Sequence, residues 1–316
     1  MERNTAEGGF SIPTKLDHLL EIVVALNCPE GRTETPVPFF SLVRRNKPTS
    51  IVPGVLTPSF CLILQGSKKL HLGQDTIYYG PGDYLVSLID IPASGQVVGA
   101  TPQSPYIGLR VDITAEEIAS VIMDSGIDLK PLYRKLGPGA YVGKSDVHLQ
   151  LLFIRLLELR GKPEAEIRFL SSLIKREMIF RLLTGDHGHL FVQRVFMDQQ
   201  NEGISRAIEW IKENYNRTFT IEEVARSSKM SVSGLHHKFK AVTTMAPQQY
   251  QKQLRLQEAR RLMLNGSANA TTAALEVGYE SPAQFNREYR RLFGLPPLQD
   301  IKAFHRKPVP EVFESS

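Results

Sequence analysis

The residue types that carry most enzyme chemistry are few in this sequence and stand apart from one another. Cys28 and Cys61 are the two cysteines, and both lie in apolar stretches where a buried, unreactive thiol is expected. His187 and His189 form a His-x-His pair, but no third ligand follows at metal spacing, so we expect a loop there. His71 is the lone histidine of residues 36–112, and no Ser, His and Asp stand in a nucleophile context. We therefore predict no catalytic residues, no metal, no cofactor and no enzyme.

Basic side chains are concentrated in the last third of the chain. The 316 residues carry a formal net charge of +5. Residues 201–316 hold 17 Lys and Arg against 12 Asp and Glu, whereas residues 1–200 hold 21 of each kind. The whole positive excess therefore lies in residues 201–316, and this asymmetry favours a polyanionic partner there.

Residues 204–242 predict three helices with a tight turn before the last one. Residues 204–215 are amphipathic, Thr220 and Glu223 have the spacing of a capping box, and Ser231 is a good N-cap for the third helix. Apolar residues recur on one face of that helix. Its outer face carries Ser233, His236, His237 and Lys240. A capped helix, a tight turn and a second helix with a polar, basic outer face is the helix–turn–helix pattern.

The same pattern recurs in residues 271–293. Thr271 and Thr272 are expected to cap a short helix, and Ser281 with Pro282 begins the next one, because Pro suits the first helical position. The outward or flanking residues of that helix are Ala283, Gln284, Asn286, Arg287, Arg290 and Arg291. A helix over 248–264 joins the two units and spans about 25 Å at 1.5 Å per residue. We therefore expect the two outer helices about 34 Å apart, one turn of DNA.

Residues 36–112 have a different character, with short β-branched and apolar runs separated by Gly and Pro. The predicted strands are 39–43, 60–64, 69–72, 76–79, 84–89, 96–100 and 106–111. This spacing indicates an all-β barrel or sandwich.

Helical periodicity flanks the predicted strands. We predict helices over 15–26, 115–123, 146–160 and 164–184, and a polar linker over 198–203. The helices within 146–184 hold more apolar surface than a small barrel needs, so they are our candidate dimer face.

These patterns divide the chain into three parts. Residues 1–112 form an N-terminal helix plus the barrel, residues 113–200 a helical segment for dimerisation or linkage, and residues 201–316 the DNA-binding part. No run of about 20 apolar residues could span a membrane, and the first ten residues lack the apolar core of a secretory signal. We predict a cytoplasmic protein.

Residues 204–297 resemble the DNA-binding domain of the AraC/XylS family of bacterial transcription regulators. The similar stretches are Ile221–Ala225, Met230–Lys240, Pro247–Tyr250, Arg255–Leu262 and Ala274–Gly294. Residues 15–160 also resemble the N-terminal domain of a subgroup of this family, through Ser59–Lys68, Tyr79–Tyr84 and Ser104–Tyr106. The resemblance implies an α+β multidomain fold. In it, a cupin-like β-barrel with flanking helices precedes an all-α domain of two helix–turn–helix units joined by a long helix.

The resemblance also implies roles for individual residues. The family's base-contacting positions fall on Ser233, His236 and His237 in the first unit, and on Ala283, Gln284 and Arg287 in the second. Arg287 is the best candidate for a bidentate guanine contact. The candidates for phosphate contacts are Lys240, Lys252, Ser281 and Arg290. For Arg260 and Arg261, an ion pair with Glu258 or Glu222 is as plausible as a phosphate contact.

The N-terminal barrel of this family binds a small effector or mediates dimerisation. Aromatic side chains could line such a pocket, and our candidates are Phe39, Phe60, Tyr79 and Tyr84. The alternative is that these rings fill the core of the barrel.

We therefore predict a sequence-specific regulator, an activator, that binds double-stranded promoter DNA, RNA polymerase and a small-molecule effector. It can form a homodimer and has no membrane partner. Two alternatives stay open: a cupin-type enzyme with a C-terminal docking module, and a regulator that needs no ligand. The enzyme would require metal ligands that the sequence does not offer.

Overall fold

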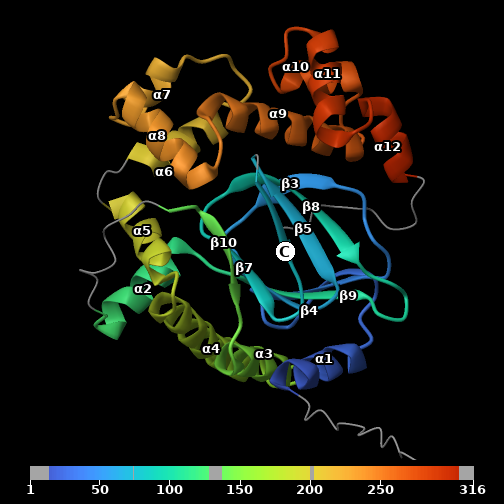
Figure 1. The fold of residues 1–316 in the computed structure, drawn as a ribbon, viewed down its shortest axis with the longest axis vertical. Helices are drawn as coiled ribbons and strands as arrows, with labels where there is room; N and C mark the ends of the chain where they lie inside the picture. Colours follow the sequence, from blue (N-terminus) through green and yellow to red (C-terminus); the bar gives the residue numbers. More distant parts are fainter. Residues whose placement is uncertain (1–13, 74, 128–136, 200–202, 306–316) are drawn as a thin grey trace, which may run out of the picture.

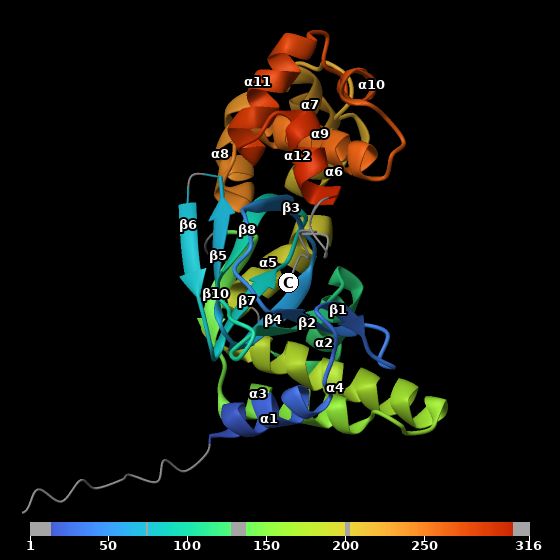
Figure 2. The same ribbon diagram turned by 90° about the vertical axis from the view of Figure 1, so that its right-hand side faces the viewer.

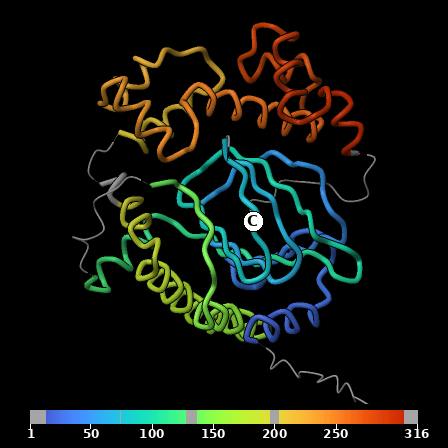
Figure 3. The backbone as a smooth tube through the Cα atoms, in the orientation of Figure 1, coloured from blue at the N-terminus to red at the C-terminus, as the bar shows by residue number. Residues whose placement is uncertain are grey.

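The computed structural model describes residues 14–73, 75–127, 137–199 and 203–305. Figure 1 shows a β-sheet domain in the middle, a helical domain above it, and a layer of helices below and beside it. The fold is therefore mixed α+β, with an N-terminal sheet domain and a C-terminal helical domain, as the sequence predicts. Figure 3 traces the same path as a continuous tube.

The described strands form two antiparallel sheets. The larger sheet has the order β1 (Gly31–Glu34), β2 (Phe40–Arg45), β9 (Tyr106–Asp112), β4 (Ser59–Gln65), β7 (Asp83–Ser87) and β10 (Ala140–Lys144). The smaller sheet has the order β3 (Val52–Leu56), β8 (Ile91–Gly99), β5 (Ser67–Leu72) and β6 (Asp75–Tyr79). The sheets pack face to face, since one apolar cluster joins Cys61 and Leu85 of the larger sheet to Leu70 and Ile91 of the smaller.

Five helices cover the other face of the larger sheet. They are α1 (Lys15–Ala25), α2 (Ala115–Ser125), α3 (Val147–Glu158), α4 (Glu164–Thr184) and α5 (Gly188–Gln199). Phe60 and Val86 of the sheet share an apolar cluster with Phe153 of α3 and Ile179 of α4. Strand β4 is therefore buried on both faces, which explains its nearly continuous apolar sequence. Helices α2–α5 thus share one core with α1 and the larger sheet.

The C-terminal domain consists of seven described helices. They are α6 (Gly203–Glu213), α7 (Ile221–Ser227), α8 (Val232–Thr243), α9 (Pro247–Leu264), α10 (Ala270–Glu276), α11 (Pro282–Phe293) and α12 (Pro297–His305). The buried residues of α6–α8 belong to the same apolar cluster as the side chains between the two sheets. Helices α10 and α11 instead form a separate small core with the second half of α9. Figure 2 shows this domain stacked on the end of the sheets, opposite α1, α3 and α4.

The predicted strands all occur, but three further strands do not follow from the sequence pattern. Strand β1 is four residues long, and β3 contains Pro53 and Gly54, which resemble a turn. Strand β10 pairs with β7 along its whole length. These short segments take their conformation from the neighbouring strand more than from local propensity.

Two helices and one cap also differ from the prediction. We expected a loop at His187 and His189, but His187 lies in a short turn and His189 lies in α5. This helix begins at Gly188 and continues through Asp198, where we expected the linker. Residues 200–202 of that linker lie outside the described residues. Helix α12 was not predicted. Helix α10 is capped by Asn269, whose Oδ1 accepts from the backbone N–H groups of Thr271 and Thr272, so these threonines are not the caps.

None of the described helices is long and apolar enough to cross a membrane.

Candidate nucleic-acid interface

The first helix–turn–helix unit is fixed by two N-caps and a buried face. Thr220 and Glu223 form the predicted capping box, in which the Thr220 N–H donates to Glu223 Oε2 at 2.8 Å and the Glu223 N–H to Thr220 Oγ1 at 3.3 Å. Ser231 Oγ accepts from the Gly234 N–H at 3.1 Å and begins α8. Leu235 and Phe239 are fully buried beneath α8. The opposite face of α8 must therefore point outward.

That outward face carries the predicted contact residues of the first unit. They are Ser233, His236, His237 and Lys240, and all four are exposed. Within the described part of the chain, none of these side chains makes a hydrogen bond or an ion pair. They are thus available to an external partner.

The second unit repeats this construction around a turn that contains a glycine. Gly278 lies between α10 and α11 with φ +88°, and a Cβ there would lie 1.9 Å from the carbonyl oxygen of Asn216. Only glycine fits this left-handed position without strain. Ser281 Oγ caps α11 by accepting from the Gln284 N–H at 3.3 Å. Phe285 and Tyr289 are buried below the helix.

The outer face of α11 carries the second predicted set. Ala283, Gln284, Arg287 and Arg290 are exposed, and Ser281 is half-buried at the start of the helix. Gln284 Nε2 lies 3.4 Å from Glu288 Oε1 along the helix. Arg287 and Arg290 make no side-chain hydrogen bond or ion pair to the residues that the structure describes. Lys252 on α9 is also exposed.

The arginines of the connecting helix α9 have structural partners instead. Arg255 donates to the carbonyl oxygens of Tyr215 (2.6 Å) and Gly278 (2.9 Å) and so holds the turn of the second unit.

The neighbouring two arginines form ion pairs. Arg261 binds Glu258 at 2.6 Å, one of the two partners expected from the sequence. Arg260 binds Asp300 of α12 at 2.7 Å, which is neither of them. These contacts separate the arginines that hold the domain together from those left exposed on α11.

The four aromatic residues proposed for an effector pocket do not lie together. Phe60 and Tyr84 pack against each other at 4.9 Å between ring centroids, on the helix-covered face of the larger sheet. Tyr79 belongs to β6 of the smaller sheet and is buried in the cluster between the two sheets. Phe39 is half-buried under the ammonium group of Lys175, 4.3 Å from the ring centroid.

Several contacts tie the sheet domain to the first unit and to α9. Tyr250 Oη donates to the carbonyl oxygen of Asp90 at 2.9 Å, and Lys212 forms an ion pair with the Asp90 carboxylate. Gln257 Nε2 donates to the carbonyl oxygen of Gly54 at 2.7 Å. A cleft of about 580 Å³ lies at this junction, lined among others by Val55, Leu254, Gln257, Arg261 and Phe304. The position of α9 is therefore coupled to β3 and to the turn at Asp90.

The cysteines and histidines set aside in the sequence lie in separate places. Cys61 is buried, whereas Cys28 is half-buried and lines two smaller cavities of about 400 and 290 Å³ near α1 and β1. His71 Nδ1 lies 2.9 Å from Thr76 Oγ1. Among the residues that the structure describes, no three His, Cys, Asp or Glu side chains gather at a possible metal site.

Two family models match this chain. A model described as the AraC-type transcriptional regulator N-terminus matches residues 36–190, and a model described as a helix-turn-helix domain matches residues 224–303. Together they cover nearly three quarters of the sequence.

Similar proteins include two curated activators. The lactose operon transcription activator of Staphylococcus xylosus is 30% identical over 99 residues, which are 31% of this chain and 36% of that protein. The HTH-type transcriptional activator RhaS of Escherichia coli O1:K1 / APEC is 26% identical over 159 residues, 49% of this chain and 55% of RhaS. The chain thus matches between about a third and just over half of their length.

A similar solved structure covers most of the chain. It is ToxT from Vibrio cholerae strain SCE256 with unsaturated fatty acid bound, with a TM-score of 0.54 and 11% identity. The alignment covers 83% of this chain and 94% of ToxT. At this identity the likeness shows a shared fold, in which a sheet domain precedes the two helical units.

Proposed function

Because the chain belongs to the AraC/XylS family of bacterial transcription regulators, we propose that it binds promoter DNA sequence-specifically in the cytoplasm and activates transcription through RNA polymerase. This proposal depends on the exposed face of α11, where Arg287 has no partner among the described residues while the arginines of α9 are paired within the domain. A free guanidinium near the start of an exposed, capped helix is suited to a bidentate contact with guanine O6 and N7.

The two outer helices have different contact chemistry. On α11, Arg287 and Gln284 supply hydrogen-bond donors for base edges, and Ala283 offers apolar contact to a thymine methyl group. On α8, Ser233, His236 and His237 can donate or accept. The second unit is therefore the stronger discriminator between base pairs. Lys240, Lys252 and Arg290, with the α11 N-terminus at Ser281, bind phosphates and set the register on the duplex.

The test is selection of genomic DNA fragments by the full-length protein at about 150 mM salt, where non-specific binding is weak. Wild type should enrich sites with two half-motifs about one helical turn apart. Arg287→Ala should lose about 1–3 kcal/mol of discrimination at one base pair. The matched control is Arg261→Ala, which removes the same charge from a residue that lines the cleft between α9 and β3.

The results separate recognition from general electrostatics. Enriched sites that lose one base preference in Arg287→Ala, but not in Arg261→Ala, would support the proposal. Equal weakening in both variants at all sequences would mean that Arg287 contributes only charge. The selection is repeated with cell extract, which can supply a small-molecule effector. If no DNA site is enriched in either condition, sequence-specific binding is contradicted.

We further propose that the sheet domain binds a small-molecule effector and passes the signal through its junction with α6 and α9. The hydrogen bonds from Tyr250 to Asp90 and from Gln257 to Gly54 join the sheets to the helix that spaces the two units. ToxT, which shares this fold, was solved with unsaturated fatty acid bound. A ligand that displaces β3 or the turn at Asp90 would thereby change the placement of α9.

We also propose that α4 pairs with α4 of a second copy of this chain. Phe169, Leu173 and Phe180 leave 65%, 46% and 40% of their surface exposed along one side of α4. Phe169 lies five residues before Ile174, and Phe180 lies five residues after Lys175. A two-fold axis midway along the helix would therefore bring each Phe169 to Phe180 of the other copy, as an isologous contact requires.

Light scattering of the full chain at micromolar concentration tests this contact. Wild type should be a dimer, and Phe169→Glu should be a monomer because two carboxylates would enter the apolar contact. Met123→Glu on α2 is the control, since Met123 is 74% exposed but lies on another helix. A monomeric wild type, or a dimeric Phe169→Glu variant, would contradict the pairing.

A further inference from the structure

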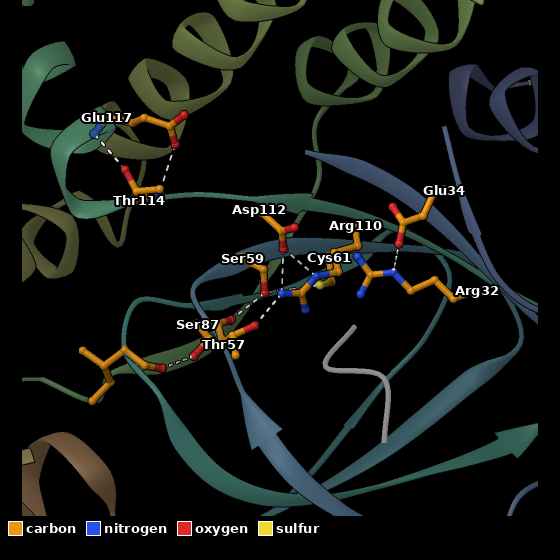
Figure 4. Close-up of polar contacts among 11 residues, drawn as sticks. Arg32, Glu34, Thr57, Ser59, Cys61, Ser87, Arg110, Asp112, Thr114 and Glu117 are labelled. Atoms are coloured by element: carbon orange, nitrogen blue, oxygen red, sulfur yellow. Dashed lines mark hydrogen bonds and ion pairs between the residues drawn. The ribbon is translucent and has the colours of Figure 1, made fainter. Parts of the chain in front are cut away.

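Three buried polar side chains form a row across the larger sheet, on the face that looks toward the smaller sheet. Ser41 of β2 is directly opposite Arg110 of β9, and Arg110 is directly opposite Cys61 of β4. Side chains at such positions have Cβ atoms about 4.5–5.5 Å apart. Ser41, Arg110 and Cys61 are 1%, 3% and 3% exposed. Figure 4 shows Cys61 and Arg110 on their adjacent strands.

Two hydrogen-bonding groups in this row have no partner among the residues that the structure describes. Arg110 Nε donates to Asp112 Oδ1 at 2.7 Å, and Nη2 donates to Thr57 Oγ1 at 2.6 Å. Its remaining nitrogen, Nη1, is buried without an acceptor, and Ser41 Oγ is buried without any partner. Buried polar groups are almost always hydrogen-bonded, because an unpaired one loses its interaction with water. Because these two donors lie on neighbouring strands, a single ligand with two acceptor atoms could satisfy both.

The charges around the row favour an anion. Arg45, Lys68 and Arg110 are the charged residues of the sheets that are buried within the described part of the chain, and all three are cations. Asp112, the carboxylate bound to Arg110, keeps 43% of its side chain exposed, so water screens its charge more than that of the enclosed guanidinium. Burial raises the pKa of the Cys61 thiol, while Arg110 and Lys68 act in the opposite direction. Cys61 is therefore a neutral neighbour.

We propose that Ser41 and Arg110 bind the carboxylate group of a small organic acid between the two sheets. One carboxylate oxygen accepts from Arg110 Nη1 and the other from the Ser41 hydroxyl, which satisfies both orphaned donors with charge-assisted hydrogen bonds. This assignment rests on the proposed effector-binding role of the sheet domain and names the chemical class of the effector.

The row is connected to the junction with the DNA-binding domain. Cys61 pairs with Leu85 of β7. The next pair on the same face is Ser59, the first residue of β4, with Ser87, the last residue of β7. Ser87 Oγ donates to the carbonyl oxygen of Ile89 at 2.8 Å, in the turn that contains Asp90. Asp90 is the residue that Tyr250 and Lys212 contact. A carboxylate bound at the row would thus lie two strands from the turn that holds α6 and α9.

Thermal unfolding of the full-length protein tests the site with defined probes. Sodium acetate is compared with sodium chloride at equal ionic strength, and with acetamide, which has the same shape but no charge, all at neutral pH. At ten times the dissociation constant, a ligand raises the folded-to-unfolded ratio about elevenfold. For a domain of this size, that change corresponds to an increase in Tm of about 3–5 °C.

Two variants address the residues. Ser41→Ala removes a hydroxyl that has no partner, so it should fold with an unchanged or higher Tm but lose at least half of the acetate response. Arg110→Gln should lose the whole response, although it also loses the bonds to Asp112 and Thr57. Ser171→Ala is the control for a buried serine outside the sheets, on α4, and should respond to acetate as wild type does.

The site is supported if acetate raises the Tm but acetamide and chloride do not. The increase should be smaller in Ser41→Ala and unchanged in Ser171→Ala. Equal Tm values in acetate and chloride, or an undiminished response in Ser41→Ala, overturns it. The DNA selection is carried out on the same wild-type preparation. If the protein enriches specific DNA sites but its Tm does not respond to acetate, only this inference is rejected. If it enriches no DNA sites, the proposed regulator function is rejected.

Discussion

A buried ion pair should decide whether the second helix–turn–helix unit stays folded. Asp300 Oδ2 accepts from Arg260 Nε at 2.7 Å and from Tyr289 Oη at 2.8 Å, and Asp300 Oδ1 accepts from Arg260 Nη2 at 3.1 Å. The side chains of Asp300 and Arg260 are each 11% exposed. These bonds join α12 to α9 and α11. The change to make is Asp300→Ala.

The magnitude follows from the burial of the partners. Removing Asp300 leaves the Arg260 guanidinium enclosed between the rings of Phe293 and Phe304 without a counter-charge. Removing one member of a buried pair costs about 3–5 kcal/mol. The core of this unit is small and separate from the core of the first unit. The loss should therefore appear as local opening of α10–α12 and not as unfolding of the whole chain.

Amide hydrogen exchange of the full-length protein is the assay. A loss of about 3–5 kcal/mol corresponds to exchange that is about 10²–10⁴-fold faster, and we expect it in α10, α11 and α12. Helices α6 and α8 should keep their protection. Asp124→Ala is the control, because the ion pair of Asp124 with Arg176 is exposed on both sides and should be worth less than about 1 kcal/mol.

Two results would refute this reasoning. Unchanged exchange in α10–α12 of Asp300→Ala would show that the buried pair contributes no net stability. Equally faster exchange in α6 and α8 would show that the two units do not open separately.

Three further changes have defined outcomes. Gly278→Ala should destabilise the second unit by more than the roughly 1–2 kcal/mol of a left-handed alanine, because its Cβ also meets the Asn216 oxygen. Hydrogen exchange in α10 and α11 measures it, and wild-type protection would contradict the turn geometry. Tyr250→Phe should cost about 1 kcal/mol in urea unfolding by removing the bond to Asp90, and an unchanged midpoint would show that the bond is neutral. Burial alone would raise the pKa of Glu177, but hydrogen bonds from Arg181 and Arg155 lower it overall below its ordinary 4.5. The Glu177 carboxylate therefore stabilises the fold above that value and stops doing so as pH falls through the lower folded pKa. Glu177→Gln should show a shallower acid loss of Tm than wild type, and parallel curves would contradict the assignment.

The helix–turn–helix units could be predicted from the sequence because their signals are local. Capping residues such as Thr220 and Ser231 stand next to the helices that they cap, and the 3.6-residue period identifies which side chains point outward. The exception is α10, where Asn269 competes with two threonines and makes two hydrogen bonds as the cap. An Asx side chain just before a helix is the signal that could have identified it.

Other features depend on residues that are distant in the sequence. Asp300 on α12 binds Arg260 on α9, 40 residues away in the sequence, so the pair does not follow from local spacing. Ser41, Arg110 and Cys61 come together only through the register of three strands. A sequence shows that each strand alternates, but not which residue of a neighbouring strand lies opposite. For the same reason the aromatic candidates lie apart, with Phe60 and Tyr84 on the helix-covered face of the larger sheet and Tyr79 on β6 of the smaller sheet.

The continuous core from the sheets into the first helical unit restricts how such regulators can be recombined. Ile204, Ile208 and Phe239 share one apolar cluster with Leu70, Ile91 and Val97 of the smaller sheet. In a chimera joined near residue 203, the apolar surface of the sheets from one protein would therefore have to fit the apolar surface of the first helical unit from another. A junction within α9 would cross less of this shared core, because the buried residues of α10 and α11 cluster with the second half of α9, separately from the core of the first unit. The sheet domain and the first unit are expected to be exchanged as one block, with the second unit as the separately replaceable part.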